Sequence, residues 1–241
     1  MTYVSFIIPA YKSASTLENN LPYLLDFIKE KNWNAEVIVV DDGSQDNGAT
    51  HDVANRLGVF YYNYTRNKGK GYAVRYGMQR ANGKYRIFTD VDIPFEKEGM
   101  AQFLHYLDFK EFDVVVGDRT LPQSSYFTEI STIRKFGSNI FSFIVGRFVA
   151  GGHFDTQCGM KGFSAKAAED LFSVGKLNGF AFDVELLYIS LKRNYDIKRL
   201  PVVLRCQEGS SVNVLKHGTK MLVDLFQIKW NHLTGKYSKS K

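Results

Sequence analysis

The sequence is poor in cysteine and proline and has no long hydrophobic run. Its 241 residues include only two cysteines, Cys158 and Cys206, and five prolines. Two cysteines without histidine neighbours exclude a disulfide scaffold and a zinc site of the usual spacing, and they favour a reducing cytoplasm. The longest apolar segment, residues 136–150, is interrupted by Ser138, Asn139, Ser142 and Arg147. It falls short of the roughly 18 to 20 residues of a membrane-spanning helix, and no secretory signal precedes it.

The composition is that of a globular protein with a slight excess of positive charge. Hydrophobic residues make up 44% and charged residues 23%, and the net charge is 31 − 25 = +6. A chain of this length buries a substantial core. The lysines beyond Trp230, with 15% aromatic residues overall, suit attachment to an anionic membrane surface as well as a solubilising tail. No basic stripe or nucleic-acid motif accompanies the charge, so we expect no nucleic-acid partner.

Short apolar segments alternate with helical patterns through the first half of the chain. The predicted strands are residues 3–8, 36–40, 59–62, 85–89 and 113–116, and the predicted helices are residues 15–31, 47–57, 71–81 and 97–108. This alternation indicates βαβ units and therefore an α/β fold with a mostly parallel, Rossmann-like sheet flanked by helices.

The regular alternation fades after residue 120. We predict helices at 130–150, 165–173, 182–192 and 212–230, a strand at 197–204, and a glycine-rich loop or strand at 151–163. Because no linker or repeat separates these segments, we expect a single domain. Its parts are a nucleotide-sugar half (1–120), an acceptor half (121–212) and a C-terminal amphipathic helix with a basic tail (213–241).

Acidic residues follow several of the predicted strands. Asp41-Asp42-Gly43-Ser44, Asp90-Val91-Asp92 and Gly117-Asp118-Arg119 come directly after the second, fourth and fifth strands. Right-handed crossovers place the carboxyl ends of parallel strands at one sheet edge, where such folds bind ligands. Neither a G-x-G-x-x-G motif nor a P-loop is present, which argues against a dinucleotide oxidoreductase and an ATPase.

Asp90 and Asp92 are the sharpest candidates for a metal site. Alternate carboxylates at the end of a strand can bind one Mg²⁺ or Mn²⁺ ion that is shared with a diphosphate. The alternative is a pair of exposed loop aspartates, which is the commoner explanation of an isolated D-x-D tripeptide.

Two other segments suit a nucleotide. Asp41 and Asp42 can accept hydrogen bonds from a base or a ribose, while Asp42 or Asp46 can also cap the following helix. Lys68 and Lys70, in a glycine-containing segment before a helix, can bind a phosphate. The alternative for this segment is a solvated basic loop.

Taken in order, these motifs resemble those of the inverting family 2 glycosyltransferases, which have the GT-A fold. The motifs are Ile8-Pro9-Ala10-Tyr11, Val40 to Asp46, Asn67 to Gly71, Asp90-Val91-Asp92, Gly117-Asp118-Arg119 and Asp155 to Gly159. The D-T-Q-C-G-x-K run at residues 155–161, together with Phe182 to Leu187, is similar to the dolichyl-phosphate and polyprenyl-phosphate glucosyl- and mannosyltransferases, the glucosyl branch especially. The resemblance covers roughly residues 3 to 212.

The resemblance implies a role for each matching residue. The residues expected to bind the nucleoside are Pro9, Tyr11, Asp41 and Asp42, with Lys70 near the nucleotide. Asp90 and Asp92 are expected to hold the metal and diphosphate, with Asp92 counted among the catalytic residues. Arg119 and Arg134 are expected to bind the lipid phosphate, although Arg134 also suits an ordinary surface position.

Asp155 is expected to orient the acceptor or to act as a weak base, unless it holds a turn together. Asp183 and Glu185 are site candidates by family similarity alone. The sequence departs from its relatives where Ile93-Pro94 replaces a polar residue that often contacts the metal. This departure predicts a metal shell completed by water.

We therefore hypothesise a metal-dependent inverting hexosyltransferase that is peripheral on the cytoplasmic face of a membrane. The expected donor is UDP-glucose, with GDP-mannose as the second choice, and the expected acceptor is a polyprenyl phosphate. The protein would contact the membrane surface or a membrane partner subunit. The alternatives are a glycosyltransferase with a soluble saccharide or protein acceptor, and a non-catalytic adaptor at the membrane surface.

Overall fold

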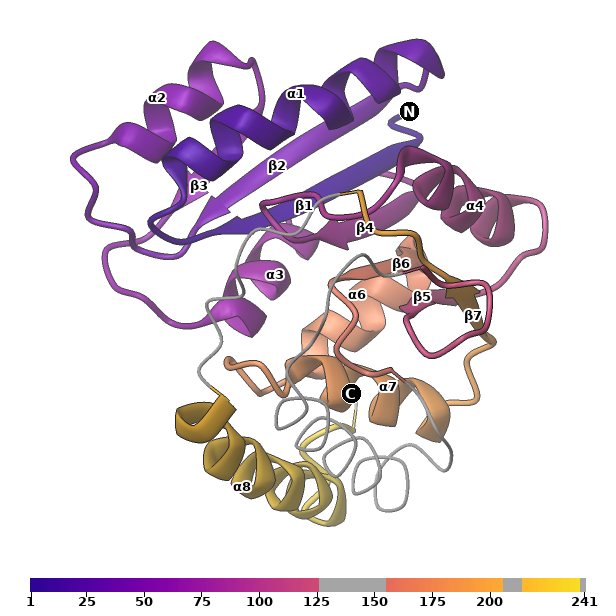
Figure 1. Cartoon of the computed structure of the whole chain (residues 1–241). Helices are drawn as coiled ribbons and strands as arrows, with labels where there is room; N and C mark the ends of the chain where they lie inside the picture. The colour runs from indigo at the N-terminus through magenta and orange to yellow at the C-terminus, as the bar shows by residue number, and fades with distance from the viewer. Residues whose placement is uncertain (126–154, 206–213, 239–241) are drawn as a thin grey trace.

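The structure is a computed structural model that describes residues 1–125, 155–205 and 214–238, with side chains in the last range from 223 onward. In these residues seven strands form one sheet with the order β3-β2-β1-β4-β6-β5-β7 (Figure 1). The strands are β1 (Val4–Ala10), β2 (Ala35–Asp41), β3 (Phe60–Asn63), β4 (Tyr85–Thr89), β5 (Val114–Asp118), β6 (Met160–Ser164) and β7 (Ile197–Pro201).

One strand of the sheet runs against the others. β1 pairs in parallel with β2 and β4, β2 pairs in parallel with β3, and β5 pairs in parallel with β7. β6 lies antiparallel between β4 and β5, with Thr89 opposite Met160. Its first residue therefore lies at the carboxyl edge of the other strands. The predicted α/β class with a mostly parallel sheet is confirmed.

Helices cover both faces of the sheet. They are α1 (Ala14–Glu30), α2 (Ala49–Arg56), α3 (Lys70–Met78), α4 (Lys97–Asp108), α6 (Ala165–Val174), α7 (Phe182–Lys192) and α8 (Val214–Leu233). The core of one face includes Phe6, Leu21 and Phe103, from β1, α1 and α4. The core of the other includes Phe88 and Phe172, from β4 and α6, and extends to α8 (Figure 1).

The strands form where the sequence has nearly continuous apolar runs, because the central strands are covered on both sides. The predicted strand 197–204 ends earlier, at Pro201, since its neighbour β5 ends at Asp118, the partner of Pro201. The predicted segment 151–163 is a strand in its last residues, within β6. The helix expected at 130–150 lies outside the described residues.

Helix α2 begins later than the predicted 47–57 because Gly48 adopts a left-handed conformation at its start. The N-cap position is Gly48 and not the predicted Asp46, which lies two residues earlier. Asp46 still accepts a hydrogen bond from the backbone N–H of Thr50 in the first turn, at 3.0 Å, and so supports the start of the helix. Asp42 does not cap this helix and instead contacts the segment before α3.

Helix α3 approaches the sheet closely at Gly77. A Cβ atom there would lie 2.6 Å from Cγ2 of Ile7 and 3.0 Å from Cγ2 of Val40. Gly99 of α4 makes no such approach, because a Cβ at that position would meet only Cε of Met160, at 3.7 Å. The first glycine is required by packing, whereas the second is not.

We predict that Gly77→Ala lowers the free energy of unfolding by about 1–3 kcal/mol, the usual cost of overpacking a core. Gly99→Ala is the matched control, and we expect it to be neutral or to stabilise by up to about 1 kcal/mol, because alanine favours a helix over glycine. Urea unfolding followed by circular dichroism measures both. Equal effects of the two substitutions would contradict the packing of α3 described above.

Candidate functional site

The acidic residues predicted to gather at one edge of the sheet do lie there. Asp41 ends β2, Asp90 directly follows β4, and Asp118 ends β5. These strands run in the same direction, so the carboxylates share the carboxyl edge. β6 brings residues 155–159 to the same edge because it runs the opposite way.

Asp41 and Asp42 are buried, with 5% and 4% of their surface exposed. Asp41 accepts hydrogen bonds from the backbone and hydroxyl of Ser44, and from the hydroxyl of Tyr61 at 2.8 Å. Asp42 accepts from the hydroxyl of Tyr64 and from the backbone N–H groups of residues 68 and 69, at 2.7 to 2.9 Å. Burial raises the pKa of the Tyr64 hydroxyl, and the hydrogen-bonded Asp42 carboxylate raises it further. A carboxylate has about four acceptor positions. Hydrogen bonds from the described residues fill three of them on each aspartate and leave one on Oδ2.

Pro9 and Tyr11 lie beside these aspartates. Pro9 pairs with Val40 in the sheet register, and Tyr11 follows the end of β1 with 45% of its surface exposed. The carbonyl of Ala10 accepts a hydrogen bond from the backbone N–H of Asp42, at 2.8 Å. The exposed ring of Tyr11 therefore belongs to the rim of the edge that carries Asp41 and Asp42.

Lys70 connects the segment of residues 67–71 to the D-x-D motif at residues 90–92. Its ammonium lies 2.5 Å from Oδ1 of Asp90, and its side chain is only 21% exposed. Burial acts to lower the pKa of Lys70, but the charges of Asp90 and Asp183 outweigh it and the pKa is raised. Lys70 therefore remains a cation beside Asp90.

Gly159 leaves the space that the Asp90 carboxylate occupies. A Cβ atom at position 159 would overlap that carboxylate. Gly159 is part of the D-T-Q-C-G run, yet residue type alone does not reveal this contact, which depends on the antiparallel pairing of β6 with β4.

The turn that carries Asp92 is strained, and Arg205, from a distant part of the chain, hydrogen-bonds to its carbonyl groups. Ile93 donates its N–H to the carbonyl of Asp90 at 2.9 Å and has a φ of 41°, which a β-branched residue rarely adopts. Such strain costs about 1–3 kcal/mol and is often found at functional sites. Arg205 donates to the carbonyls of Asp92 and Ile93 at 3.4 and 3.3 Å, and to Oδ1 of Asn20 at 2.7 Å. No motif in the sequence indicates this role of Arg205.

Arg119 and Asp155 contact each other. The Arg119 guanidinium donates to both carboxylate oxygens of Asp155, at 2.5 and 2.8 Å, and its backbone N–H donates at 3.0 Å. Asp118 is fully buried and accepts from Nε of Arg199 at 2.6 Å. The residues predicted to bind a lipid phosphate and to orient the acceptor thus form a fork-to-fork ion pair. Arg134, the other predicted phosphate ligand, lies outside the described residues.

A second layer of polar contacts supports the start of α3. The carbonyl of Asn178 accepts from the backbone N–H of Gly71 at 2.8 Å. The buried Glu185 carboxylate accepts from the N–H groups of residues 176 and 177, at 2.9 and 2.8 Å, and from the hydroxyl of Tyr237 at 2.7 Å. Burial raises the pKa of Glu185 despite these hydrogen bonds. Hydrogen bonds and the intervening backbone therefore connect Tyr237, through Glu185 and residues 176–178, to the segment of residues 67–71.

Asp183 forms a buried ion pair with Lys161, at 2.7 Å, that joins α7 to β6. Lys161 has no exposed surface, and it also donates to the carbonyl of Cys158 at 2.8 Å. Cys158 is a buried free thiol, and burial raises its pKa to about 12. It packs as a small apolar side chain, as predicted. Lys161 is the last residue of the D-T-Q-C-G-x-K run, but the sequence does not reveal its burial or its ion pair with Asp183.

The described residues contain no group of three or more His, Cys, Asp or Glu side chains that could hold a metal ion. Asp90 and Asp92 are the residues that could contribute to such a site. Mg²⁺ is usually bound by one or two carboxylates together with substrate phosphates and water. Two carboxylates, with Asp90 lying in the space left by Gly159, fit a metal ion whose other ligands come from a diphosphate and water. Among the described residues they are too few to bind the ion without such a substrate.

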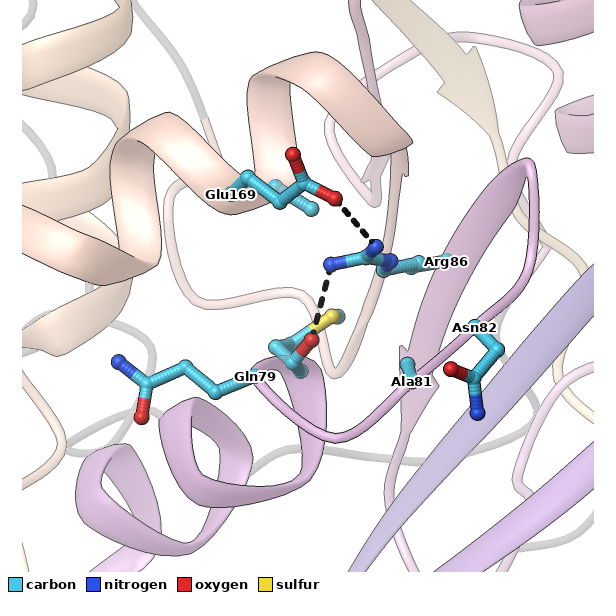
Figure 2. A pocket seen from close by; sticks show the side chains of 7 residues that line it. Gln79, Ala81, Asn82, Arg86 and Glu169 are labelled. Atoms are coloured by element: carbon cyan, nitrogen blue, oxygen red, sulfur yellow. Dashed lines mark hydrogen bonds and ion pairs between the residues drawn. The ribbon is translucent and has the colours of Figure 1, made fainter.

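A pocket at the opposite edge of the sheet contains different chemistry. Arg86, near the amino end of β4, donates to the carbonyl of Met78 at 3.0 Å and to Glu169 at 2.8 Å (Figure 2). These contacts tie α3 and α6 to the sheet. None of the predicted site residues lines this pocket.

Comparison with known proteins identifies the family. Residues 5–172 match the model of glycosyl transferase family 2. The chain is 33% identical to the dolichyl-phosphate beta-glucosyltransferase of Drosophila melanogaster, over 96% of this chain and 76% of the relative. It is 29% identical to the enzyme of the same name from Saccharomyces cerevisiae, over 99% of this chain and 78% of the relative.

Solved structures share the fold at low sequence identity. Glucosyl-3-phosphoglycerate synthase from Mycobacterium tuberculosis, in complex with Mn²⁺ and UDP-glucose, has a TM-score of 0.67 at 17% identity, over 93% of this chain and 78% of the other. Mannosyl-3-phosphoglycerate synthase from Rubrobacter xylanophilus has a TM-score of 0.70 at 17% identity, over all of this chain and 77% of the other. The predicted GT-A architecture is confirmed by these neighbours. The chain therefore belongs to glycosyl transferase family 2 and is a glycosyltransferase, as the order of its motifs predicts.

Proposed function

We propose that the protein transfers glucose from a nucleotide sugar to a polyprenyl or dolichyl phosphate, with inversion at the anomeric carbon. UDP-glucose is the first donor proposed and GDP-mannose the second. One observation carries the proposal: the segment of residues 67–71 binds Asp42 at one end and, through Lys70, Asp90 at the other. The names of the relatives, which match nearly the whole chain, support the sugar and the acceptor.

The nucleoside is proposed to bind at Asp41 and Asp42. Each carboxylate is held by three hydrogen bonds and keeps one acceptor position on Oδ2 for an N–H or O–H group of the ligand. Pro9 and the exposed ring of Tyr11 would border the same site.

The diphosphate is proposed to bind at Asp90, Asp92 and Lys70. Asp90 and Asp92 would hold Mg²⁺ or Mn²⁺, which when bound neutralises negative charge on the departing diphosphate. Lys70 is a cation already in place 2.5 Å from Asp90, and a phosphate oxygen is a suitable second partner for it.

The reaction requires no strong base. An oxygen of the lipid phosphate is already anionic, so it attacks the anomeric carbon directly. The new carbon–oxygen bond forms while the bond to the diphosphate breaks, and the nucleoside diphosphate leaves with that electron pair. Arg119 is proposed to bind the acceptor phosphate and Asp155 to orient Arg119, because the two are joined by a bidentate contact. Positioning and charge stabilisation then supply most of the rate enhancement.

A lipid acceptor requires contact with a membrane, and we propose a peripheral location on the cytoplasmic face, with a membrane partner subunit as a further means of attachment. Among the helices of the described residues, none combines the length and the apolar character needed to cross a bilayer. The membership in glycosyl transferase family 2 argues against the non-catalytic adaptor, so the alternative to a lipid acceptor is a soluble one. The experiments below distinguish the two acceptors.

We predict that Asp92→Asn lowers turnover by at least about 100-fold, because it removes a carboxylate from the diphosphate site. The assay measures release of nucleoside diphosphate from UDP-glucose with polyprenyl phosphate and Mn²⁺. Chelation with EDTA should abolish turnover, and added Mg²⁺ or Mn²⁺ should restore it. Asp26→Asn, on the exposed side of α1, is the control and should retain full activity. Undiminished turnover in EDTA would refute metal dependence.

We predict that Gly159→Ala lowers turnover by at least about tenfold, because a 1 Å shift of an active-site group has effects of that order or larger. The new Cβ would displace the Asp90 carboxylate. Gly99→Ala serves as the control for a glycine that contacts no site residue. Wild-type turnover in a folded Gly159→Ala protein would show that the position of Asp90 is unimportant.

We predict that label from UDP-[¹⁴C]glucose enters an organic-extractable lipid when polyprenyl phosphate is supplied. The measurement is the radioactivity in the organic phase, compared between UDP-glucose and GDP-mannose. Label that moves instead into a water-soluble saccharide or protein would favour the soluble-acceptor alternative. Absence of transfer from both donors, in the presence of Mg²⁺ or Mn²⁺, would refute the proposed donors.

A further inference from the structure

Helix α8 exposes an apolar face that the proposed reaction does not use. Val223, Phe226, Trp230 and Leu233 have 64%, 79%, 63% and 78% of their surface exposed. Their spacing of three, four and three residues places them on one side of a helix. Four large apolar side chains in a row form a contiguous surface, unlike the scattered exposed residues that any protein has.

This face is not the one by which α8 joins the protein. Leu225, Ile228 and Asn231 are buried, and the first two belong to the core beneath α7. At roughly 100° per residue, the buried and exposed groups point to nearly opposite sides of the helix. α8 therefore has two apolar faces, of which the described residues cover one. In Figure 1 the helix lies at the end of the molecule away from α1 and α2.

The surroundings of the exposed face are basic. Residues 214–241 contain six lysines and one acidic residue, Asp224, which is 8% exposed. The ammonium groups of Lys229 and Lys192 lie over the same ring of Tyr188, at 4.9 and 5.8 Å from its centre. Burial, and then the charge of Lys192, lowers the pKa of Lys229. Within the described part of the chain neither lysine forms an ion pair, so an anion beside them would relieve their mutual repulsion.

We propose that α8 lies along the surface of an anionic lipid bilayer. Val223, Phe226, Trp230 and Leu233 enter the boundary between headgroups and acyl chains, and Lys192 and Lys229 contact lipid phosphates. Aromatic and aliphatic side chains on one face, flanked by lysine, form the pattern of an interfacial helix. This inference deepens the proposed function and rests on it for the need to meet a lipid acceptor.

Charge favours a bilayer over a second copy of the chain as the occupant of this face. Two copies that met through α8 would bring the lysines of both chains together, in a protein whose net charge is +6. An anionic bilayer offers an apolar layer to the exposed side chains of α8 and negative charge to the nearby lysines.

The test measures binding to vesicles that contain neither acceptor nor donor. Co-sedimentation compares vesicles of phosphatidylcholine alone with vesicles that also contain phosphatidylglycerol. We expect the wild type to bind the anionic vesicles, and Phe226→Ser/Trp230→Ser to bind them at least about tenfold more weakly. Phe109→Ser is the matched control, since Phe109 is 73% exposed at the end of α4. It should bind as the wild type does.

Two further measurements separate the apolar and basic contributions. Trp230 fluorescence should shift to shorter wavelength on anionic vesicles, whereas Trp33, which packs against Phe6 and Phe27, should not change. The substitutions Lys192→Gln and Lys229→Gln together should weaken binding to anionic vesicles about tenfold, with an effect that disappears at high salt.

Three results would overturn the proposal. They are equal binding by Phe226→Ser/Trp230→Ser and the wild type, equal binding to neutral and anionic vesicles, and a dimer in analytical ultracentrifugation that the double substitution dissociates while vesicle binding is absent. The vesicles carry no substrate, so these results are independent of turnover. With a detergent-dispersed acceptor, Phe226→Ser/Trp230→Ser should keep wild-type turnover. If neither the wild type nor the variants transferred glucose, the proposed function would be contradicted, but the vesicle measurements would still test the role of α8.

Discussion

The antiparallel strand β6 is the constraint on which the arrangement of the candidate site depends. It separates β4 from β5 and runs against both, so the segment that precedes it arrives at the carboxyl edge, where the other strands end. Asp155 thereby reaches Arg119, and Gly159 lies against the Asp90 carboxylate. A parallel strand in the same position would deliver these residues to the opposite edge, far from the D-x-D motif.

Several charged side chains at this edge and beneath it are held in ion pairs. Lys70 contacts Asp90, Arg119 contacts Asp155, and Lys161 contacts Asp183 in the interior. Each pair offsets part of the cost of removing charges from water. Lys70 and Arg119 are thereby held in position by a carboxylate, so either cation needs little rearrangement to meet an anion. A site of this kind is preorganised for anions before a ligand arrives.

Much of this arrangement follows from local sequence patterns. The apolar runs that end in Asp41-Asp42 and Asp90-Val91-Asp92 define both the strands and their shared edge, because parallel connections allow few alternatives. Residues 160–164 carry no local indication of strand direction, so the reversal of β6 and the contact of Gly159 with Asp90 could not be predicted. The role of Arg205 depends on a chain reversal that brings it to the carbonyls of Asp92 and Ile93, more than 110 residues earlier. The positive φ of Ile93 likewise runs against the preference of its residue type, so the local sequence does not predict it.

The hydrogen bond from Tyr237 to Glu185 joins the last described segment to the interior. Glu185 in turn holds residues 176 and 177, and the next residue, Asn178, accepts from the first turn of α3. The segment around Tyr237 therefore supports the start of α3, which lies on another part of the fold. Loss of the Tyr237 hydroxyl would consequently reach α3, because it would release the Glu185 carboxylate that holds residues 176 and 177.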